Sequence, residues 1–323
     1  MIVIENVGPA SPKLHNTQWI MSLRWGCLLA LMVLIYGSHA PLITLTKVDG
    51  EVPFNPSSCV VMIELAKLLI SLVSLFLTGN FSALQSRPPL VIVAPYAVPG
   101  LLYALNNNLV VVMQAYMDPS SYQVLSNLKI ASTALLYCFC LGKRLTFRQW
   151  FALGLLMAAG ACHSYSNLDL NETDGANEGL KLHITTWGLF LVFVYCCVSG
   201  LAAVYTEMVL KRQNLPLSLQ NIYLYVFGVG LNLVSSFSTS ATGRGFLGGY
   251  TIVVWTIIAG QAVNGLLMSV VLKHGSGITR LFVISCSMLV NALMSWAVLG
   301  LQLTPVFLLP VTMVGLAAYL YYK

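Results

Sequence analysis

Residues 57–78 have the sequence SSCVVMIELAKLLISLVSLFLT, in which only Glu64 and Lys67 are charged. A helix of about 20 predominantly apolar residues is long enough to cross the hydrocarbon core of a bilayer. Apolar windows of this length recur along the chain between short polar segments, so each is predicted to span a membrane. Their approximate limits are 22–45, 57–78, 90–114, 119–141, 147–166, 184–210, 218–240, 250–272, 278–300 and 303–322. The sequence therefore predicts an all-α membrane protein of about ten transmembrane helices.

The third span differs from the others because Pro95, Pro99 and Gly100 interrupt it. A broken helix is tolerated inside a membrane where neighbouring helices or a cavity satisfy the freed backbone groups. We therefore expect this span to be irregular and to lie against other helices or a cavity.

The composition supports a polytopic membrane protein. Of 323 residues, 58% are hydrophobic and 8% are charged, and the mean hydropathy is +0.81, a balance foreign to soluble domains. The net charge of +6 is interpreted as loop lysines and arginines that set orientation, not as a nucleic-acid-binding surface. The 8 cysteines and 5 histidines have neither metal-ligand spacing nor the loop placement of a disulfide framework. No metal site or cofactor is expected.

The loop charges predict the orientation of the spans. Basic residues are concentrated in the N-terminal tail, the even-numbered loops and the C-terminus, whereas acidic residues are concentrated in the odd-numbered loops. By the positive-inside rule, both termini are expected in the cytoplasm. Asn171 begins a glycosylation sequon in the acidic loop predicted over 167–183, on the lumenal side where glycosylation occurs.

A weak internal repeat suggests two halves. Residues 141–146 (LGKRLT) resemble residues 299–304 (LGLQLT), and both segments join a fourth span to a fifth within their half. Because five is an odd number, the second half must enter the membrane from the opposite side, as in many secondary transporters. We expect a cytoplasmic tail over 1–21, a first repeat over 22–166, a lumenal loop over 167–183 and a second repeat over 184–323.

Charged residues inside predicted spans are the strongest functional signal. A charge in hydrocarbon costs roughly 3 kcal/mol or more on insertion scales, and such residues usually face a water-filled cavity. The excess is positive, so it points to an anionic cargo bound near the midplane between the two halves. The five residues are Glu64, Lys67, Lys129, Glu207 and Arg280.

Lys129 is the best candidate for binding the anion. It lies about ten residues into its span. Ser126 precedes it by three residues and Tyr122 precedes Ser126 by four, so the three side chains share one helix face. A cation beside hydroxyl groups in a dry site suits a phosphate or pyrophosphate. Arg280 begins the ninth span, where its depth is equally compatible with a simple interfacial arginine and with a site residue that offers a bidentate fork to the same group.

The other polar residues allow more than one interpretation. Glu64 and Lys67, at i and i+3, are equally compatible with a structural ion pair and with a cavity wall. Glu207 is expected to be structural, because Lys211 and Arg212 follow it closely. The amides of residues 106–108 could bind base or ribose edges, whereas the small-residue run from Gly260 to Gly265 is interpreted as a helix-packing surface.

Several motifs form a set with matched order and spacing: residues 63–71 (IELAKLLIS), 103–108 (YALNNN), 122–124 (YQV) with 128–130 (LKI), Ser199–Gly200 with Val204, Tyr205 and Glu207, Asn221–Ile222 with Tyr225, and 269–273 (SVVLK). This set resembles the nucleotide-sugar transporters of the CMP-sialic acid and UDP-galactose group, subfamily A of solute carrier family 35. The resemblance implies the ten-helix drug/metabolite-transporter fold and a Golgi location. It also implies exchange of a cytosolic nucleotide-sugar for a lumenal nucleoside monophosphate.

The same resemblance implies roles for individual residues. Lys129 corresponds to the family's phosphate-binding lysine, and the remaining substrate-binding positions fall on Tyr122, Asn107, Asn108, Asn221, Tyr225, Glu64 and Lys67. Three departures from the family pattern leave the identity of the base and the sugar open. Arg280 stands where the family has a second phosphate-binding lysine, and Ser126 stands where it has a tyrosine in the fourth-span motif. Residues 106–108 are Asn-Asn-Asn where the family has Gln-Asn-Asn.

The favoured hypothesis is a Golgi antiporter for pyrimidine nucleotide-sugars, UDP-, CMP- or CDP-linked, which works by alternating access. Its expected partners are the nucleotide-sugar, the nucleoside monophosphate and the bilayer, and it could form homo- or hetero-oligomers with related transporters. The alternatives are a non-transporting scaffold that assembles with related transporters or glycosyltransferases, and a membrane-embedded transferase. A transferase would need acid/base or metal groups near one mouth of the cavity, and the loop acids are better interpreted as solvated.

Overall fold

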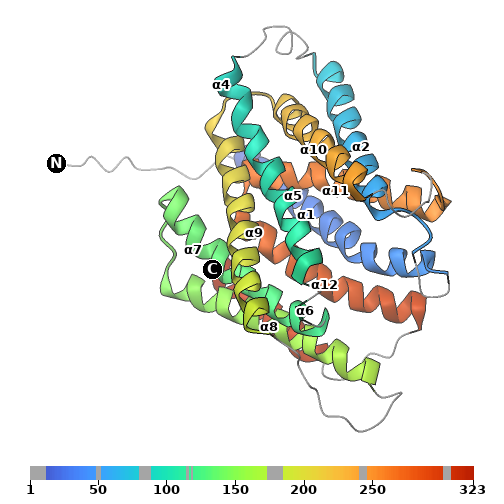
Figure 1. Ribbon diagram of the computed structural model, residues 1–323. Coiled ribbons are helices and arrows are strands. Elements are labelled where there is room, and N and C mark those ends of the chain that lie inside the picture. Colours follow the sequence, from blue (N-terminus) through green and yellow to red (C-terminus); the bar gives the residue numbers. More distant parts are fainter. Residues whose placement is uncertain are drawn as a thin grey trace.

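The computed structural model describes residues 12–48, 52–79, 89–113, 116–117, 119–172, 185–239, 246–300 and 307–323. Within these ranges the regular elements are all helices (Figure 1). They are α1 (Pro12–Thr46), α2 (Pro56–Leu77), α4 (Leu90–Val93), η1 (Ala94–Tyr96), α5 (Ala97–Met113), α6 (Pro119–Leu125), η2 (Ser126–Leu128), α7 (Lys129–Leu141), α8 (Phe147–Glu172), α9 (Thr186–Arg212), α10 (Leu217–Thr239), α11 (Ile252–His274), α12 (Gly277–Leu299) and α13 (Leu308–Tyr322).

Each of the ten predicted spans corresponds to a helix or to a broken run of helices. Eight of the described spans are long and apolar enough to cross a membrane, and α13 is a shorter apolar helix. The third span is irregular as predicted, with a 3-10 turn at Ala94–Tyr96 between α4 and α5. The fourth span is also broken, by the 3-10 turn of η2, which the sequence did not indicate.

Some boundaries differ from the prediction. The first helix begins at Pro12, within the segment expected to be a tail. Helix α8 continues to Glu172, so the backbone of Asn171 lies in its last turn and not in the loop expected from residue 167. The side chain of Asn171 and the repeat segment at 301–304 lie outside the described residues.

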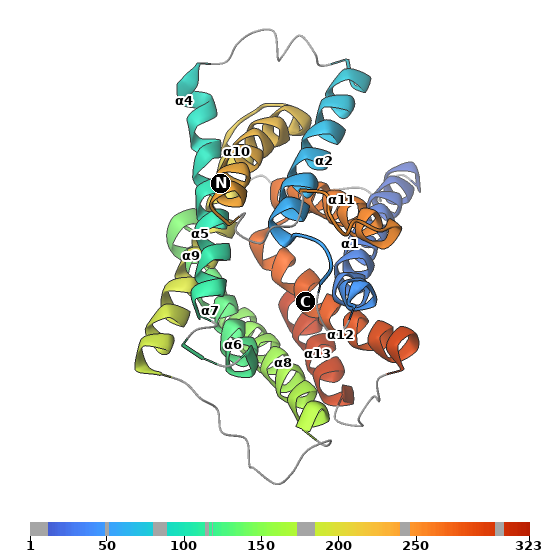
Figure 2. The same ribbon diagram turned by 45° about the vertical axis from the view of Figure 1, so that its right-hand side comes forward.

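The helices pack with the two-fold repetition of an inverted repeat. Counted from the start of each half, α1 corresponds to α9, α2 to α10, α5 to α11, α7 to α12 and α8 to α13. The contacts α1–α12, α1–α11 and α2–α11 therefore correspond to α9–α7, α9–α5 and α10–α5. All six contacts are present. The α2–α10 and α8–α13 contacts are their own counterparts, and both are present. Figure 2 shows α10 lying between α2 and α5. This pattern agrees with the predicted pair of five-helix repeats.

Glycines at two related positions allow the closest helix crossings. A Cβ at Gly37 of α1 would lie 2.7 Å from the backbone oxygen of Ser287 in α12. Its counterpart, Gly200 of α9, faces the backbone of Thr133 in α7, where a Cβ would lie 3.1 Å from the nitrogen. Small residues let helix backbones approach in this way inside a membrane, where packing drives association.

We therefore expect Gly37→Ala to lower the thermal stability of the full chain in detergent. The added methyl group meets backbone atoms that cannot rotate away, and such overpacking typically costs about 1–3 kcal/mol. Gly154→Ala in α8 is the matched control, since no atom lies within 4 Å of a Cβ there. Equal melting temperatures for Gly37→Ala and the wild type would contradict the proposed crossing.

Candidate functional site

A polar cavity of about 320 Å³, here called the central chamber, lies among helices of both halves. It is enclosed by α1, α2, α5, α9, α10, α11 and α12. A dense set of polar groups between apolar helices is expected only where water or a ligand solvates them. Its polar lining residues include Tyr36, Glu64, Lys67, Tyr103, Asn107, Tyr225, Asn232, Gln261, Asn264, Ser269 and Arg280.

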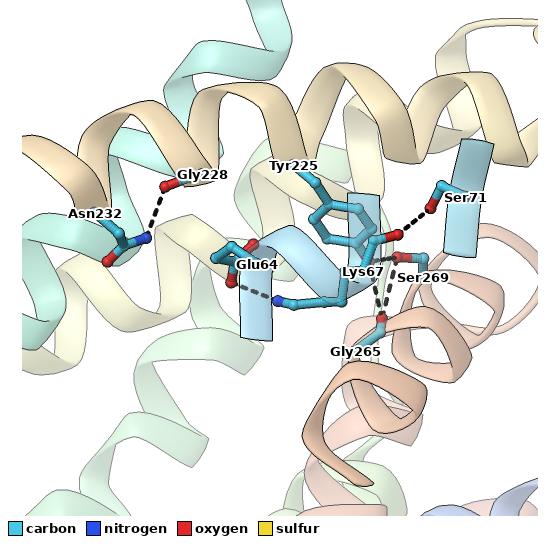
Figure 3. Close-up of polar contacts among 8 residues, drawn as sticks. All are labelled: Glu64, Lys67, Ser71, Tyr225, Gly228, Asn232, Gly265 and Ser269. Carbon is cyan, nitrogen blue, oxygen red and sulfur yellow. Dashed lines mark hydrogen bonds and ion pairs between the residues drawn. The ribbon is translucent and has the colours of Figure 1, made fainter. Parts of the chain in front are cut away.

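Glu64 and Lys67 form an ion pair on the wall of the central chamber, with the Lys67 Nζ 2.5 Å from Glu64 Oε1. Both side chains are mostly buried, at 17% and 13% exposure. The Lys67 Nζ also lies 4.9 Å from the centre of the Tyr225 ring, within cation–π range (Figure 3). The ion pair is formed and it also lines the cavity, while the role of both residues in substrate binding stays a prediction.

Glycines on two facing helices make room for this pair. A Cβ at Gly228 of α10 would lie 2.8 Å from Glu64 Oε2, and one at Gly265 of α11 would lie 2.7 Å from Lys67 Cδ. The Tyr225 hydroxyl lies 3.1 Å from Ser269 Oγ and donates to the carbonyl oxygen of Gly265 at 3.3 Å (Figure 3). Helices α2, α10 and α11 are thus held together around the ion pair.

Arg280 faces the central chamber from the first turns of α12. It donates from Nη1 to the Tyr103 hydroxyl at 3.3 Å, and its guanidinium carbon lies 5.9 Å from the centre of that ring. Its Nε is buried and has no hydrogen-bond partner among the described residues. A guanidinium with N–H donors left unused is well suited to bind an anion.

Lys129 lines a second cavity of about 300 Å³, the lateral chamber, between α6–α7, α8 and α12. The two chambers share Tyr36 and Ile284 in their walls, so Lys129 and Arg280 line adjoining cavities. In the described part of the chain the Lys129 ammonium forms neither an ion pair nor a hydrogen bond. The polar residues of the lateral chamber are Tyr36, Ser126, Asn127, Lys129, His163, Ser164, Ser285 and Asn291.

Glu207 has the structural role that the sequence predicts. Its carboxylate, only 1% exposed, lies 2.6 Å from the Lys211 Nζ and accepts a hydrogen bond from the Gly277 backbone N–H at 2.6 Å. Lys211 donates in turn to the carbonyl oxygen of Gly275. A carboxylate at a helix N-terminus is favourable, so this contact ties the end of α9 to the start of α12 and positions Arg280.

Three of the residues implied by the family resemblance do not line either chamber. Asn108 is exposed and donates to the Ala104 carbonyl oxygen. Tyr122 donates to the Tyr195 hydroxyl at 3.2 Å within an apolar cluster. Asn221 is buried in a groove between α2, α10 and α11, and its Oδ1 has no partner there. Their roles in substrate binding stay predictions, as do those of Asn107 and Tyr225, which do face the central chamber.

Several residues that line the chambers are not among those predicted from the sequence. Gln261, Asn264, Met268 and Ser269 follow the spacing of one helix face, and all four line the central chamber. The polar members of this set could have been recognised from their spacing in the sequence. The segment from Gly260 to Gly265, which contains two of them, is instead predicted to be a packing surface. That interpretation holds for Gly265, which contacts Lys67. Asn232 of the central chamber and His163, Ser164, Ser285 and Asn291 of the lateral chamber gave no comparable signal.

Within the described residues no cluster of histidine, cysteine and acidic side chains could hold a metal ion. The features of the two chambers are instead two cations without an acidic partner, amides, hydroxyls and tyrosine rings. Such a site can bind a phosphate-bearing molecule with hydroxyl groups and a flat ring.

Comparison with known proteins points the same way. A family model described as nucleotide-sugar transporter matches residues 21–322. The chain is 62% identical over 302 residues to the probable UDP-sugar transporter protein SLC35A4 of Danio rerio, covering 94% of this chain and 95% of the relative. The proteins of the same name from Rattus norvegicus and Homo sapiens are 53% and 52% identical over 306 residues, covering 93% of this chain and 94% of each relative.

A solved crystal structure shares the fold. It superimposes with a TM-score of 0.68 at 10% identity and covers 92% of this chain and 95% of the other. At that identity the match supports the helical architecture alone. The sequence matches confirm the resemblance to the nucleotide-sugar transporters of subfamily A.

Whether the charges of Glu64 and Lys67 stabilise each other can be tested by comparing single and double variants. Lys67→Met leaves a mostly buried carboxylate without its partner, so we expect a loss of about 3–5 kcal/mol in folding stability. The double variant Glu64→Gln/Lys67→Met removes both charges and should melt at a higher temperature than Lys67→Met alone. Lys143→Met, at an exposed position, serves as the control. If the double variant is no more stable than the single one, the two charges are not coupled.

Proposed function

Since the chain belongs to the nucleotide-sugar transporter family, we propose that it exchanges a cytosolic pyrimidine nucleotide-sugar for a lumenal nucleoside monophosphate across the Golgi membrane. It is thus a carrier and not an enzyme. The cargo would bind in the two chambers between the halves, and access would alternate between the two sides as the halves rock about the site.

One observation carries the proposal. Of the cations inside the spans, Lys67 is neutralised by Glu64, whereas Lys129 and Arg280 have no acidic partner in the described part of the chain. Both face cavities at the contact between the halves. An uncompensated charge at this depth is costly, so its retention suggests that an anionic ligand supplies the missing counter-charge.

The same charges offer a reason for exchange. An empty carrier would have to reorient with two repelling cations in a low-dielectric environment, where their repulsion is strongest. A bound phosphate removes that cost in either direction. Loaded carriers would then reorient much faster than empty ones, which makes transport depend on ligand on both sides.

A UDP-sugar is favoured over CMP- and CDP-linked sugars because the relatives are named as probable UDP-sugar transporters. The family resemblance supports the proposed Golgi location, and the distribution of loop charge supports the proposed cytoplasmic placement of both termini. A scaffold without transport activity is the alternative outcome of the experiment below.

We expect purified protein in liposomes preloaded with UMP to take up a UDP-sugar, and Lys129→Ala to lower that uptake at least about tenfold, since charge-assisted contacts contribute about 1.5–3 kcal/mol. Lys129→Ala should melt at the wild-type temperature or above, because it removes a buried cation that has no acidic partner in the described residues. Lys143→Ala, an exposed loop change, should transport normally.

The assay includes CMP-linked sugars and liposomes without internal nucleotide. Uptake of no nucleotide-sugar by the wild type would contradict the proposed transport. Uptake that is unaffected by internal nucleotide would contradict obligatory exchange. Normal uptake by Lys129→Ala would remove Lys129 from the binding site.

A further inference from the structure

We propose that the two chambers divide the cargo between them: the central chamber binds the nucleoside and the lateral chamber binds the sugar. The inference rests on the proposed function and adds to it the residues that select the sugar. The selecting residues are Ser126, Asn127, His163, Ser164, Ser285 and Asn291.

The chemical order of the cargo matches the order of the chambers. In a nucleotide-sugar the phosphate lies between the nucleoside and the sugar. Arg280 lines the central chamber, Lys129 lines the lateral chamber, and Tyr36 and Ile284 belong to the walls of both chambers. A phosphate at this junction would interact with both cations, so the groups on its two sides must extend into different chambers.

The central chamber has the chemistry that a base requires. Tyr36, Tyr103 and Tyr225 supply ring faces for stacking, and the amides of Asn107 and Asn264 supply donors and acceptors for the edge of a base. Asn264 is buried, and its Oδ1 has no partner among the described residues.

The lateral chamber has the chemistry that a sugar requires. Apart from Tyr36 in the shared wall, none of the described residues that line it is a tyrosine, tryptophan or phenylalanine. Hydroxyl, amide and imidazole groups from α8, α12 and η2 can both donate and accept, and a ring bearing several hydroxyl groups needs both. Its volume of about 300 Å³ is close to that of the central chamber.

Asn291 supplies independent support. Its Oδ1 is buried and has no hydrogen-bond partner in the described residues, although the residue lines the lateral chamber. Leaving a buried acceptor without a donor costs about 1–3 kcal/mol. A sugar hydroxyl in the lateral chamber would provide that donor.

The division predicts that the two exchanged ligands use the site differently. A nucleoside monophosphate has no sugar beyond its phosphate, so it would occupy the central chamber and the junction only. Changes in the lateral chamber should therefore affect binding of the nucleotide-sugar and leave binding of the monophosphate unchanged. This asymmetry separates a sugar site from a merely structural cavity.

The test measures equilibrium binding of radiolabelled UMP to the purified full chain, with displacement by unlabelled UMP, UDP-galactose and UDP-N-acetylglucosamine. Asn291→Ala should weaken at least one of the UDP-sugars roughly three- to tenfold, the effect of losing one hydrogen bond, while UMP affinity changes less than about twofold. Ser126→Tyr adds a large ring to the lateral chamber and should change the ratio of affinities for the two UDP-sugars.

Asn264→Ala in the central chamber is the matched control and should weaken UMP and both UDP-sugars by the same factor. The proposal is overturned if Asn291→Ala and Ser126→Tyr weaken UMP as much as the UDP-sugars, or if neither variant changes any affinity. Wild-type protein that binds no ligand of the panel, CMP and CMP-sialic acid included, would instead contradict the proposed function. Wild-type melting temperatures for both variants show that the fold is intact.

Discussion

The energetic cost of a charge inside a membrane is the constraint on which the arrangement of this protein depends. Two acids occupy the described spans, and each is paired with a lysine: Glu64 with Lys67, and Glu207 with Lys211. The second pair also binds the N-terminus of α12. Each acid therefore fixes the position of helices, and no acid among the described residues pairs with Lys129 or Arg280. The protein thus contains two ion pairs that hold helices together and two further cations, Arg280 in the central chamber and Lys129 in the lateral chamber, that line the cavities.

Close packing makes this arrangement possible. Gly228 and Gly265 leave space for the Glu64–Lys67 pair between α2, α10 and α11, while Gly37 and Gly200 let helices of opposite halves cross closely. The crossings are related by the two-fold repetition of helix contacts. The polar residues of the central chamber are not related in this way, because the acid and the lysine come from one half only. A symmetric framework thus encloses an asymmetric site, as a cargo with two different ends requires.

The sequence predicted what depends on local hydrophobicity and charge. It gave the ten spans, the break near Pro95 and the pairing of Glu207, because apolar length, proline and short-range charge spacing act within one helix. It did not indicate η2, the stripe from Gln261 to Ser269 as a cavity wall, or the lateral chamber. Those features depend on how each helix is rotated and on which helix of the other half it meets. His163 and Asn291 are separated by more than a hundred residues along the chain, and only the α8–α12 contact brings them to one cavity.

The departures of this chain from its family now have a spatial interpretation. The position that the family resemblance assigns to a tyrosine is Ser126, on the wall of the lateral chamber, and the position that it assigns to a second phosphate-binding lysine is Arg280, on the wall of the central chamber. Exchanging lysine for arginine preserves the positive charge that a phosphate requires. Exchanging tyrosine for serine removes a ring and leaves a hydroxyl, which changes the volume and chemistry of the proposed sugar site. Affinity for the shared phosphate would then be retained while selectivity for the sugar diverged, because the two properties reside in different residues.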